Sequence, residues 1–254
     1  VSVDAHMNQE DVAQIMQKYD LTVLPVVNKK NKLIGRITID DVVDVITESA
    51  EEERQIMSGI TSDVEEDDSI FKLSNARLPW LVIGIFGGLF GAFLLGSFES
   101  KYFEGGEVFI SLSFFIPLIM ATAGNVGIQS SSIVIQTLSS PSSFEISIAQ
   151  RLIRVILVSI LNGIVLSLLV YGGLLLFDNF NFLDFKIYSK TAKIVSVSLF
   201  SIVIVSSLLG TITPIMLDKL KFNPALASGP FITTSNDLMA LAIYFIVALF
   251  MGGI

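Results

Sequence analysis

A single carboxylate in the last apolar stretch of the chain has the clearest potential for chemistry. Asp237 is the only charged residue between Phe222 and Ile254, and no lysine or arginine lies near it in the sequence. An unpaired carboxylate in lipid costs a few kcal/mol, so it must face a partner, water or a cation. The alternative is an Asp near the interface, or a protonated one hydrogen-bonded between helices. Because intramembrane ionisable residues commonly serve ion pathways, we predict that Asp237 lies on a cation pathway.

Oxygen-bearing side chains precede Asp237 directly, in the order Thr233, Thr234, Ser235 and Asn236. Hard oxygen ligands without sulfur or imidazole favour magnesium, calcium or alkali cations over zinc or copper. Magnesium holds its water shell tightly, so one or two carboxylates that act through water are the expected arrangement. One Asp per chain is few for a divalent cation, and a twofold dimer would bring two Asp237 side chains to one pore.

A second polar interruption lies in a long apolar run and reads Gly124-Asn125-Val126-Gly127-Ile128-Gln129. Two glycines around an asparagine can unwind a helix, and irregular backbone at membrane depth survives only where it is buried in protein or lines a wet cavity. Transporters aim freed carbonyl oxygens and amide side chains at ions in this way. We predict an unwound segment here; the alternative is close helix packing through small residues.

The composition indicates which elements must position these side chains. Of 254 residues, 52% are hydrophobic and only 16% are charged, below the share of about 25% in soluble domains. From Leu78 the chain holds five apolar runs, each near the roughly 20 residues that cross a bilayer. These runs are Leu78–Phe98, Val108–Leu138, Ile148–Phe177, Thr191–Leu217 and Phe231–Ile254. We predict a mainly α-helical membrane protein with a five-helix transmembrane domain over residues 78–254.

The first 77 residues differ in character, because their 16 acidic and 8 basic residues carry the whole net charge of −8. Residues 1–48 combine helix and strand patterns and predict a small α/β domain. Residues 49–77 predict an acidic helical connector that breaks at Gly59. The expected elements of the first domain are a helix over Glu10–Tyr19, strands over Thr22–Val27 and Leu33–Ile39, and a helix from Asp40.

The same counts exclude several classes of protein. An acidic chain without a basic patch is poorly suited to nucleic acid, so we expect none as a partner. With no cysteine in the chain, neither a disulfide framework nor a thiolate zinc site can form. His6 is the only histidine, which excludes histidine-rich metal sites and a Ser-His-Asp triad within one chain.

Five spans place the two ends of the chain on opposite sides of a membrane. The loops on the two sides differ too little in lysine and arginine to set the orientation. No positive-then-apolar leader is visible before the acidic domain, so we expect that domain to be cytoplasmic and the C-terminus to lie outside a multi-pass plasma or inner membrane. The chain begins without Met, and we expect it to be part of a longer protein.

These motifs, taken in order, resemble the C-terminal part of the MgtE family of magnesium transporters and channels, and the resemblance covers nearly the whole chain. Residues 1–48 are similar to a CBS domain, a nucleotide-sensing module that normally works in pairs, and residues 49–77 to the family's plug helix. The CBS-like motifs are Leu24-Pro25-Val26-Val27, Gly35-Arg36-Ile37-Thr38 and Asp40-Asp41-Val42. The membrane motifs are Pro79-Trp80-Leu81, Pro117, the run from Gly124 to Ser130, Asn223-Pro224-Ala225-Leu226 and Ser235-Asn236-Asp237.

The resemblance implies a homodimer in the lipid bilayer, with a pore for divalent cations at the subunit interface that the second and fifth spans mainly line. The residue that matches Asp237 binds a hydrated magnesium ion there, and Asn125 and Thr233 fall at further pore contacts. Glu99 matches an acidic position at the outer mouth. The positions that the resemblance places next to the pore are Gly124, Gly127, Gln129, Asn223 and Asn236.

The resemblance also implies regulation from the cytoplasmic side, where bound magnesium closes the pore when internal magnesium is plentiful. The acidic positions that match this regulatory site are Asp41, Asp44, Glu52 and Glu53. Thr38 and Asp41 fall where CBS domains hold the ribose of ATP or another adenine nucleotide. Two residues depart from the family pattern: Asn223 replaces a common Asp before Pro-Ala-Leu, and Gly229 replaces a common Asn.

We interpret the chain as the pore domain and one regulatory domain of a magnesium channel, which changes no chemical bond and is not an enzyme. Magnesium, manganese and cobalt stay open as the physiological ion. One alternative is a proton- or sodium-coupled carrier in which Asp237 titrates. The other is a membrane-anchored nucleotide sensor whose spans only hold the CBS-like domain, which predicts tolerance of change at Asp237 and Asn125.

Overall fold

The computed structural model describes residues 1–61, 64–100, 107–138, 147–179, 189–227 and 229–251. The chain forms two compact units, Val1–Ile56 and Met57–Ile254. Each unit has a hydrophobic core of its own. The end of the last predicted span, residues 252–254, lies outside the described residues.

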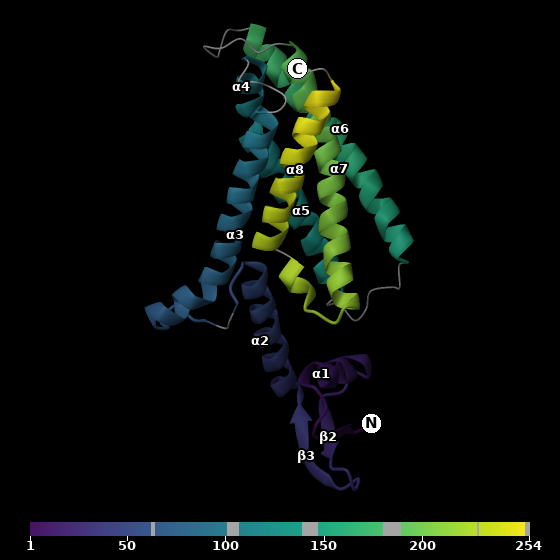
Figure 1. The fold of residues 1–254 in the computed structure, drawn as a ribbon. Coiled ribbons are helices and arrows are strands. Elements are labelled where there is room, and N and C mark those ends of the chain that lie inside the picture. The colour runs from purple at the N-terminus through teal and green to yellow at the C-terminus, as the bar shows by residue number, and fades with distance from the viewer. Residues whose placement is uncertain (62–63, 101–106, 139–146, 180–188, 228, 252–254) are drawn as a thin grey trace. The chain divides into compact units, whose positions relative to one another are not determined.

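The first unit is a small α/β fold, as the sequence predicted. A three-stranded sheet has the order β1-β2-β3, with β1 parallel to β2 and β3 antiparallel to it. Its core gathers Val12, Met16, Leu24 and Val42 from both helices and the central strand. The elements in chain order are β1 (Val3–Asp4), α1 (Gln9–Lys18), β2 (Val23–Val27), β3 (Leu33–Thr38) and α2 (Ile39–Met57) (Figure 1).

Helix α2 runs without interruption from Ile39 to Met57. It therefore continues past residue 48, where the sequence predicted the end of the first domain. The predicted break at Gly59 is confirmed: α2 ends two residues earlier, and Gly59 has a φ of 81°. This left-handed conformation is one that glycine adopts without steric cost. The division of the chain into domains 1–48, 49–77 and 78–254 stays a prediction.

The second unit is built of helices, and five of those in the described part of the chain are long and apolar enough to cross a membrane. The predicted count of five spans is therefore confirmed. The second span is bent into two helices, α4 and α5. The helices are α3 (Ile70–Phe98), α4 (Glu107–Ser113), α5 (Ile116–Leu138), α6 (Ile148–Asn179), α7 (Ser189–Lys219), the short η2 (Pro224–Ala227) and α8 (Pro230–Phe250).

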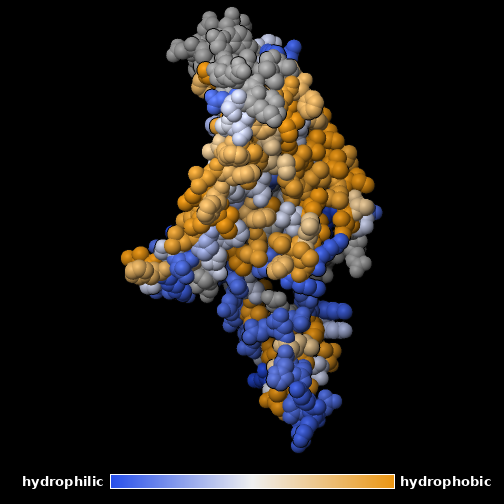
Figure 2. Space-filling model, in the orientation of Figure 1, coloured by the Kyte–Doolittle hydropathy of each residue, from blue (hydrophilic) through white to orange (hydrophobic). Residues whose placement is uncertain are grey.

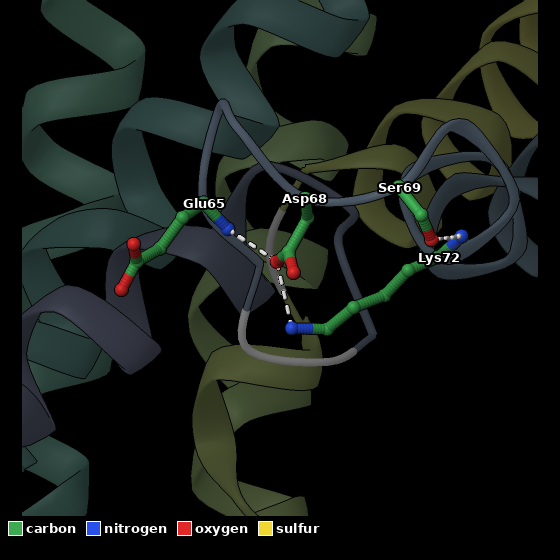
Figure 3. A network of polar contacts seen from close by, with 4 residues as sticks. All are labelled: Glu65, Asp68, Ser69 and Lys72. Carbon is green, nitrogen blue, oxygen red and sulfur yellow. Dashed lines mark hydrogen bonds and ion pairs between the residues drawn. The ribbon is translucent and has the colours of Figure 1, made fainter.

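Helix α3 begins at Ile70, eight residues before the predicted span, because a polar network fixes its first turn (Figure 3). The Ser69 hydroxyl accepts a hydrogen bond from the Lys72 amide, as a helix N-cap does. The Asp68 carboxylate accepts one from the Glu65 amide at 2.8 Å and forms an ion pair with Lys72 at 2.6 Å. The hydrogen bond from Lys72 holds the pKa of Asp68 below its ordinary value. The end of the predicted acidic connector therefore serves as the start of the first span.

The helices pack around α7, which contacts α5, α6 and α8 and is the most enclosed of the five spans. Helix α3 lies at the edge and packs on α8 (Figure 1). At the bend in the second span, the buried Tyr244 hydroxyl of α8 donates a 2.9 Å hydrogen bond to the Leu112 carbonyl oxygen. Leu112 lies at the end of α4, so this bond links α8 to the bend. On the face drawn in Figure 2, the surface of these helices is mostly hydrophobic, and that of the N-terminal unit is hydrophilic with hydrophobic patches.

Candidate functional site

Asp237 lies two turns into α8, at a point where α8 faces both α5 and α3. Its carboxylate is half-buried, and within the described part of the chain it has neither a hydrogen bond nor an ion pair. The turn before α8 depends on Gly229, whose φ of 54° and ψ of −127° are disfavoured for other residues. A Cβ atom at this position would also overlap the Met57 carbonyl oxygen. This overlap explains why glycine, rather than the Asn that is common in the family pattern, fits at position 229.

Helix α5 brings the predicted pore residues Gly124, Thr233 and Asp237 together. A Cβ atom added at Gly124 would lie 3.2 Å from Thr233 Cγ2 and 3.7 Å from Asp237 Oδ1. The Thr233 hydroxyl donates to the Gly229 carbonyl oxygen at 2.9 Å, within its own helix. The glycine thus lets the backbone of α5 approach the carboxylate closely.

The predicted unwinding around Asn125 is wrong, because α5 is helical from Ile116 to Leu138. The glycines serve close packing instead, which was the alternative. A Cβ at Gly127 would overlap the Asn236 side-chain nitrogen, and a Cβ at Gly210 of α7 would overlap the Gly127 carbonyl oxygen. Three helices therefore meet at Gly127 with no room for a side chain.

Asn236 is fully buried at this three-helix contact. Neither its amide nitrogen nor its amide oxygen has a hydrogen-bond partner among the described residues. Buried polar groups without partners cost roughly 1–3 kcal/mol each. Asn236 therefore packs against Gly127 of α5 and does not line an open space.

Polar amide side chains form a stripe on the exposed face of α5. Asn125 and Gln129, both predicted, are exposed and stand four residues apart on one helical face. Gln136, also exposed, lies eleven residues after Asn125 and so falls on the same face. Gln136 was not among the predicted pore residues, although its spacing from Asn125 could have identified it.

A cavity of about 230 Å³ lies between α3, α5 and α8, and Asp237 is the only charged side chain among the described residues that line it. Helix α3 supplies the wall opposite Asp237, largely from four glycines spaced at helical intervals. These glycines were not among the predicted site residues, although their spacing is regular. The four glycines are Gly84, Gly87, Gly88 and Gly91.

Two other predicted pore residues lie at helix ends. Asn223 accepts a hydrogen bond from the Ala225 amide at 2.8 Å and so shapes the turn that enters η2. Glu99 is exposed and follows the end of α3. Their predicted roles near the pore stay predictions.

In the first unit, the predicted nucleotide residues contact each other. The Asp41 carboxylate accepts hydrogen bonds from the Thr38 amide at 2.8 Å and from the Thr38 hydroxyl at 2.7 Å. The backbone hydrogen bond, followed by the hydroxyl one, holds the pKa of Asp41 below its ordinary value of 3.8. This pair closes the first turn of α2 as a helix cap, and nucleotide binding by Thr38 and Asp41 stays a prediction.

The predicted regulatory acids all lie on α2. Asp41 and Asp44 are in its first turns, and Glu52 and Glu53 are near its end. Eight residues of helix separate Asp44 from Glu52, which is about 12 Å along the axis. Within the described residues, no three acidic or histidine side chains come together as a metal site would require. The regulatory site stays a prediction.

Five apolar helices with an intramembrane carboxylate beside a cavity define a multi-pass membrane protein. The family model MgtE, described as a divalent cation transporter, matches residues 116–247, and the CBS domain model matches residues 1–48. The chain therefore belongs to the MgtE family, and its N-terminal region is a CBS domain.

Curated relatives agree with this assignment. The chain is 35% identical over 248 residues to a protein of Bacillus subtilis (strain 168) named magnesium transporter MgtE, covering 98% of this chain and 52% of the relative. Proteins of the same name from Enterococcus faecalis and Thermus thermophilus are each 33% identical, with 52% and 53% of their lengths covered. The chain thus spans about half the length of the curated relatives it matches.

Proposed function

We propose that this chain forms the transport pathway of a magnesium transporter, and that Asp237 is the residue at which the ion pauses. The observation that carries the proposal is the half-buried Asp237 carboxylate, which faces a cavity within the membrane helices and has no partner in the described part of the chain. Such a carboxylate is stabilised by a cation or by water. The relatives' name, magnesium transporter MgtE, supports magnesium as that cation.

The geometry fits a magnesium ion that keeps its water. Mg²⁺ releases its water shell reluctantly and is held by one or two carboxylates rather than by an all-protein cage. A lone carboxylate with Thr233 and Thr234 beside it is suited to a hydrated Mg²⁺ ion. It provides too few ligands for a dehydrated ion. Asp237 attracts the ion, and the bound waters contact the neighbouring oxygen atoms.

We further propose that two copies of the chain form the pore between them. The exposed stripe of Asn125, Gln129 and Gln136 supports this arrangement. Amide side chains on an apolar span are stabilised by hydrogen bonds to another helix or to water rather than by lipid. A second copy across a water-filled pore provides both, and it brings a second Asp237 toward the same ion.

Regulation is proposed to come from the acidic first unit. The face drawn in Figure 2 carries hydrophilic areas on this unit, and the acidic side chains of α2 include Asp41, Asp44 and Glu52. Like charges on facing surfaces repel, and bound divalent cations hold such surfaces together. In this proposal cytoplasmic magnesium, with adenine nucleotide as a second ligand of the CBS domain, sets whether the pore opens.

Magnesium flux into liposomes that contain the purified chain tests the proposal. We expect Asp237→Ala to reduce Mg²⁺ influx at least tenfold, which corresponds to about 1.4 kcal/mol. The matched control is Asp218→Ala, which removes an exposed carboxylate at the end of α7 and should leave influx unchanged. Wild-type influx in Asp237→Ala, or influx that follows a pH gradient rather than the magnesium gradient, would contradict the proposal.

A further inference from the structure

Asn236 is a buried polar side chain that the proposed transport path leaves unexplained. It is fully buried, and neither its amide nitrogen nor its amide oxygen has a hydrogen-bond partner among the described residues. Nearly all buried polar groups in proteins have a partner, so an exception needs a physical explanation. An apolar side chain of the same shape would be less costly at this place. The amide therefore makes the described packing of α8 less stable than it could be.

Ser198 of α7 is the other buried side chain without a partner in the described part of the chain, but it differs from Asn236 in one respect. A helical serine can donate to the carbonyl oxygen four residues earlier, as Ser196 does to Ala192 at 2.8 Å. A change of rotamer would thus give Ser198 a partner within its own helix. The Asn236 amide instead packs directly on the backbone of Gly127. A partner for Asn236 therefore requires α8 to move relative to α5.

The faces of α8 near Asn236 have different surroundings. Asn236 and Ala240 are buried and lie on one face, one turn apart. Thr234 and Asp237 line the cavity. Because consecutive residues of a helix are about 100° apart around the axis, Asn236 and Asp237 are neighbours around α8. A turn of α8 that carries Asn236 toward the cavity therefore also changes the direction in which Asp237 faces.

The surroundings of α8 allow such a turn. On the side of α5 it meets Gly124 and Gly127, which have no side chains that could interlock with it. Helix α8 begins directly after Gly229, whose φ is 54°, and glycine adopts a wider range of backbone conformations than other residues. Among the described residues, no side chain caps the first turn of α8. The helix thus has a smooth neighbour and an entry that can change conformation.

We propose that Asn236 is a positioning residue that sets how readily α8 turns, and that this turn releases the ion from Asp237. This inference rests on the proposed transport function. In the described arrangement Asp237 faces the cavity and the Asn236 amide lacks a partner. In the second arrangement Asn236 faces the cavity and water, and Asp237 has turned away from the ion. The cost of burying the amide keeps the two arrangements close in free energy, so that both are populated.

The first test replaces the amide by an apolar group of the same branched shape. We expect Asn236→Leu to raise the unfolding temperature of the purified chain in detergent by roughly 2–4 °C, because the described packing no longer buries an amide without a partner. We expect the same change to lower Mg²⁺ influx into liposomes about tenfold, because α8 turns less often. A merely structural role would move stability and influx in the same direction.

Ser198→Ala is the matched control, since it removes the other buried polar group that has no partner in the described residues. It should leave Mg²⁺ influx unchanged, whatever its effect on stability. Wild-type influx in Asn236→Leu, or a loss of both stability and influx in that variant, would overturn the inference. An equal fall of influx in Ser198→Ala would overturn it as well.

The second test does not depend on transport. Because the chain contains no cysteine, Ala240→Cys introduces a single thiol on the buried face of α8, one turn after Asn236. We expect a water-soluble thiol reagent to modify it slowly, and the added change Asn236→Leu to slow this reaction about tenfold. Ala192→Cys, buried in α7, is the control and should not react in either background. A thiol at position 240 that does not react, or that reacts at the same rate with Asn236→Leu, would contradict the turn.

Two results separate this inference from the proposed function. If Asp237→Ala abolishes Mg²⁺ influx while Asn236→Leu transports as the wild type does, only the inference about α8 is wrong. If Asp237→Ala transports as well as the wild type, the proposed function itself is wrong.

Discussion

The two sides of α8 differ in how its neighbours approach it. Toward α5 and α7, Asn236, Gly127 and Gly210 meet so closely that no Cβ atom fits at either glycine. Toward α3, only Gly87 makes such a contact, and the cavity opens beside it. Glycine thus serves two purposes in one helical unit: on the closed side it lets backbones touch, and on the open side it leaves space unfilled.

This difference indicates how a lone carboxylate can be held in a membrane protein. The closed side holds α8 against α5, because the side chains of Asn236 and Ile232 pack directly on the backbone of Gly127. The open side then leaves room for water or an ion next to the charge. A rigid support and an unfilled compartment on opposite sides of one helix are what an ion site needs.

The closed side is broken most severely by Gly210→Ala. The added Cβ would overlap the Gly127 carbonyl oxygen, a backbone atom that cannot rotate away, so we expect a loss of about 3 kcal/mol or more. Thermal unfolding of the purified chain in detergent checks this. Gly173→Ala, where an added Cβ meets nothing within 4 Å, is the control; equal stability of the two variants would contradict the closed side.

A smaller loss is expected from Tyr244→Phe, which removes the hydrogen bond to the Leu112 carbonyl oxygen at the bend of the second span. That oxygen also accepts a hydrogen bond from the Phe115 amide at 3.0 Å, so it keeps one partner. We expect a cost of about 1 kcal/mol, again measured by thermal unfolding. No change in unfolding temperature would show that this contact does not hold α8 to the bend.

The open side predicts an effect of the opposite sign. Gly88→Ala places a methyl group in empty space and replaces glycine inside a helix, where alanine is favoured by about 0.5–1 kcal/mol. We expect unchanged or higher thermal stability, measured by thermal unfolding of the purified chain in detergent. Lower stability would mean that α3 approaches its neighbours more closely than the cavity implies.

The smallest effect concerns pH and the first unit. The pKa of Asp41 is lowered by its hydrogen bonds with Thr38. The stabilisation of the folded first unit by this cap is therefore present above pH 3.8, the ordinary pKa, and is lost as pH falls through the lower pKa of the folded state. The Thr38 amide resonance in ¹⁵N-threonine-labelled chain should therefore shift only below pH 3.8. A shift centred above that value would contradict the cap.

The sequence predicted the spans well because lipid demands long apolar runs, a requirement that tertiary contacts do not change. Asp237 was predicted for the same reason, since a charge in such a run stands out. The second unit's packing was harder to predict. Glycines around Asn125 are compatible with an unwound or a closely packed helix, and only the positions of Asn236 and Gly210 on other helices decide between them.

The wall of α3 could not be assigned from the sequence for a related reason. The regular spacing of Gly84, Gly87, Gly88 and Gly91 predicts a smooth helix face, but it does not identify the helix that faces it. The structure pairs this face with Thr234 and Asp237. Pairings between spans that are far apart in the chain depend on contacts that no local pattern contains.

The central claim is that the charge of Asp237, rather than its shape, holds the transported ion. Asp237→Asn keeps the size of the side chain and removes the charge, and Asp218→Asn makes the same change at an exposed position. Initial Mg²⁺ influx into liposomes is the measurement. We predict at least a tenfold fall for Asp237→Asn and none for Asp218→Asn; influx equal to wild type in Asp237→Asn would contradict the account.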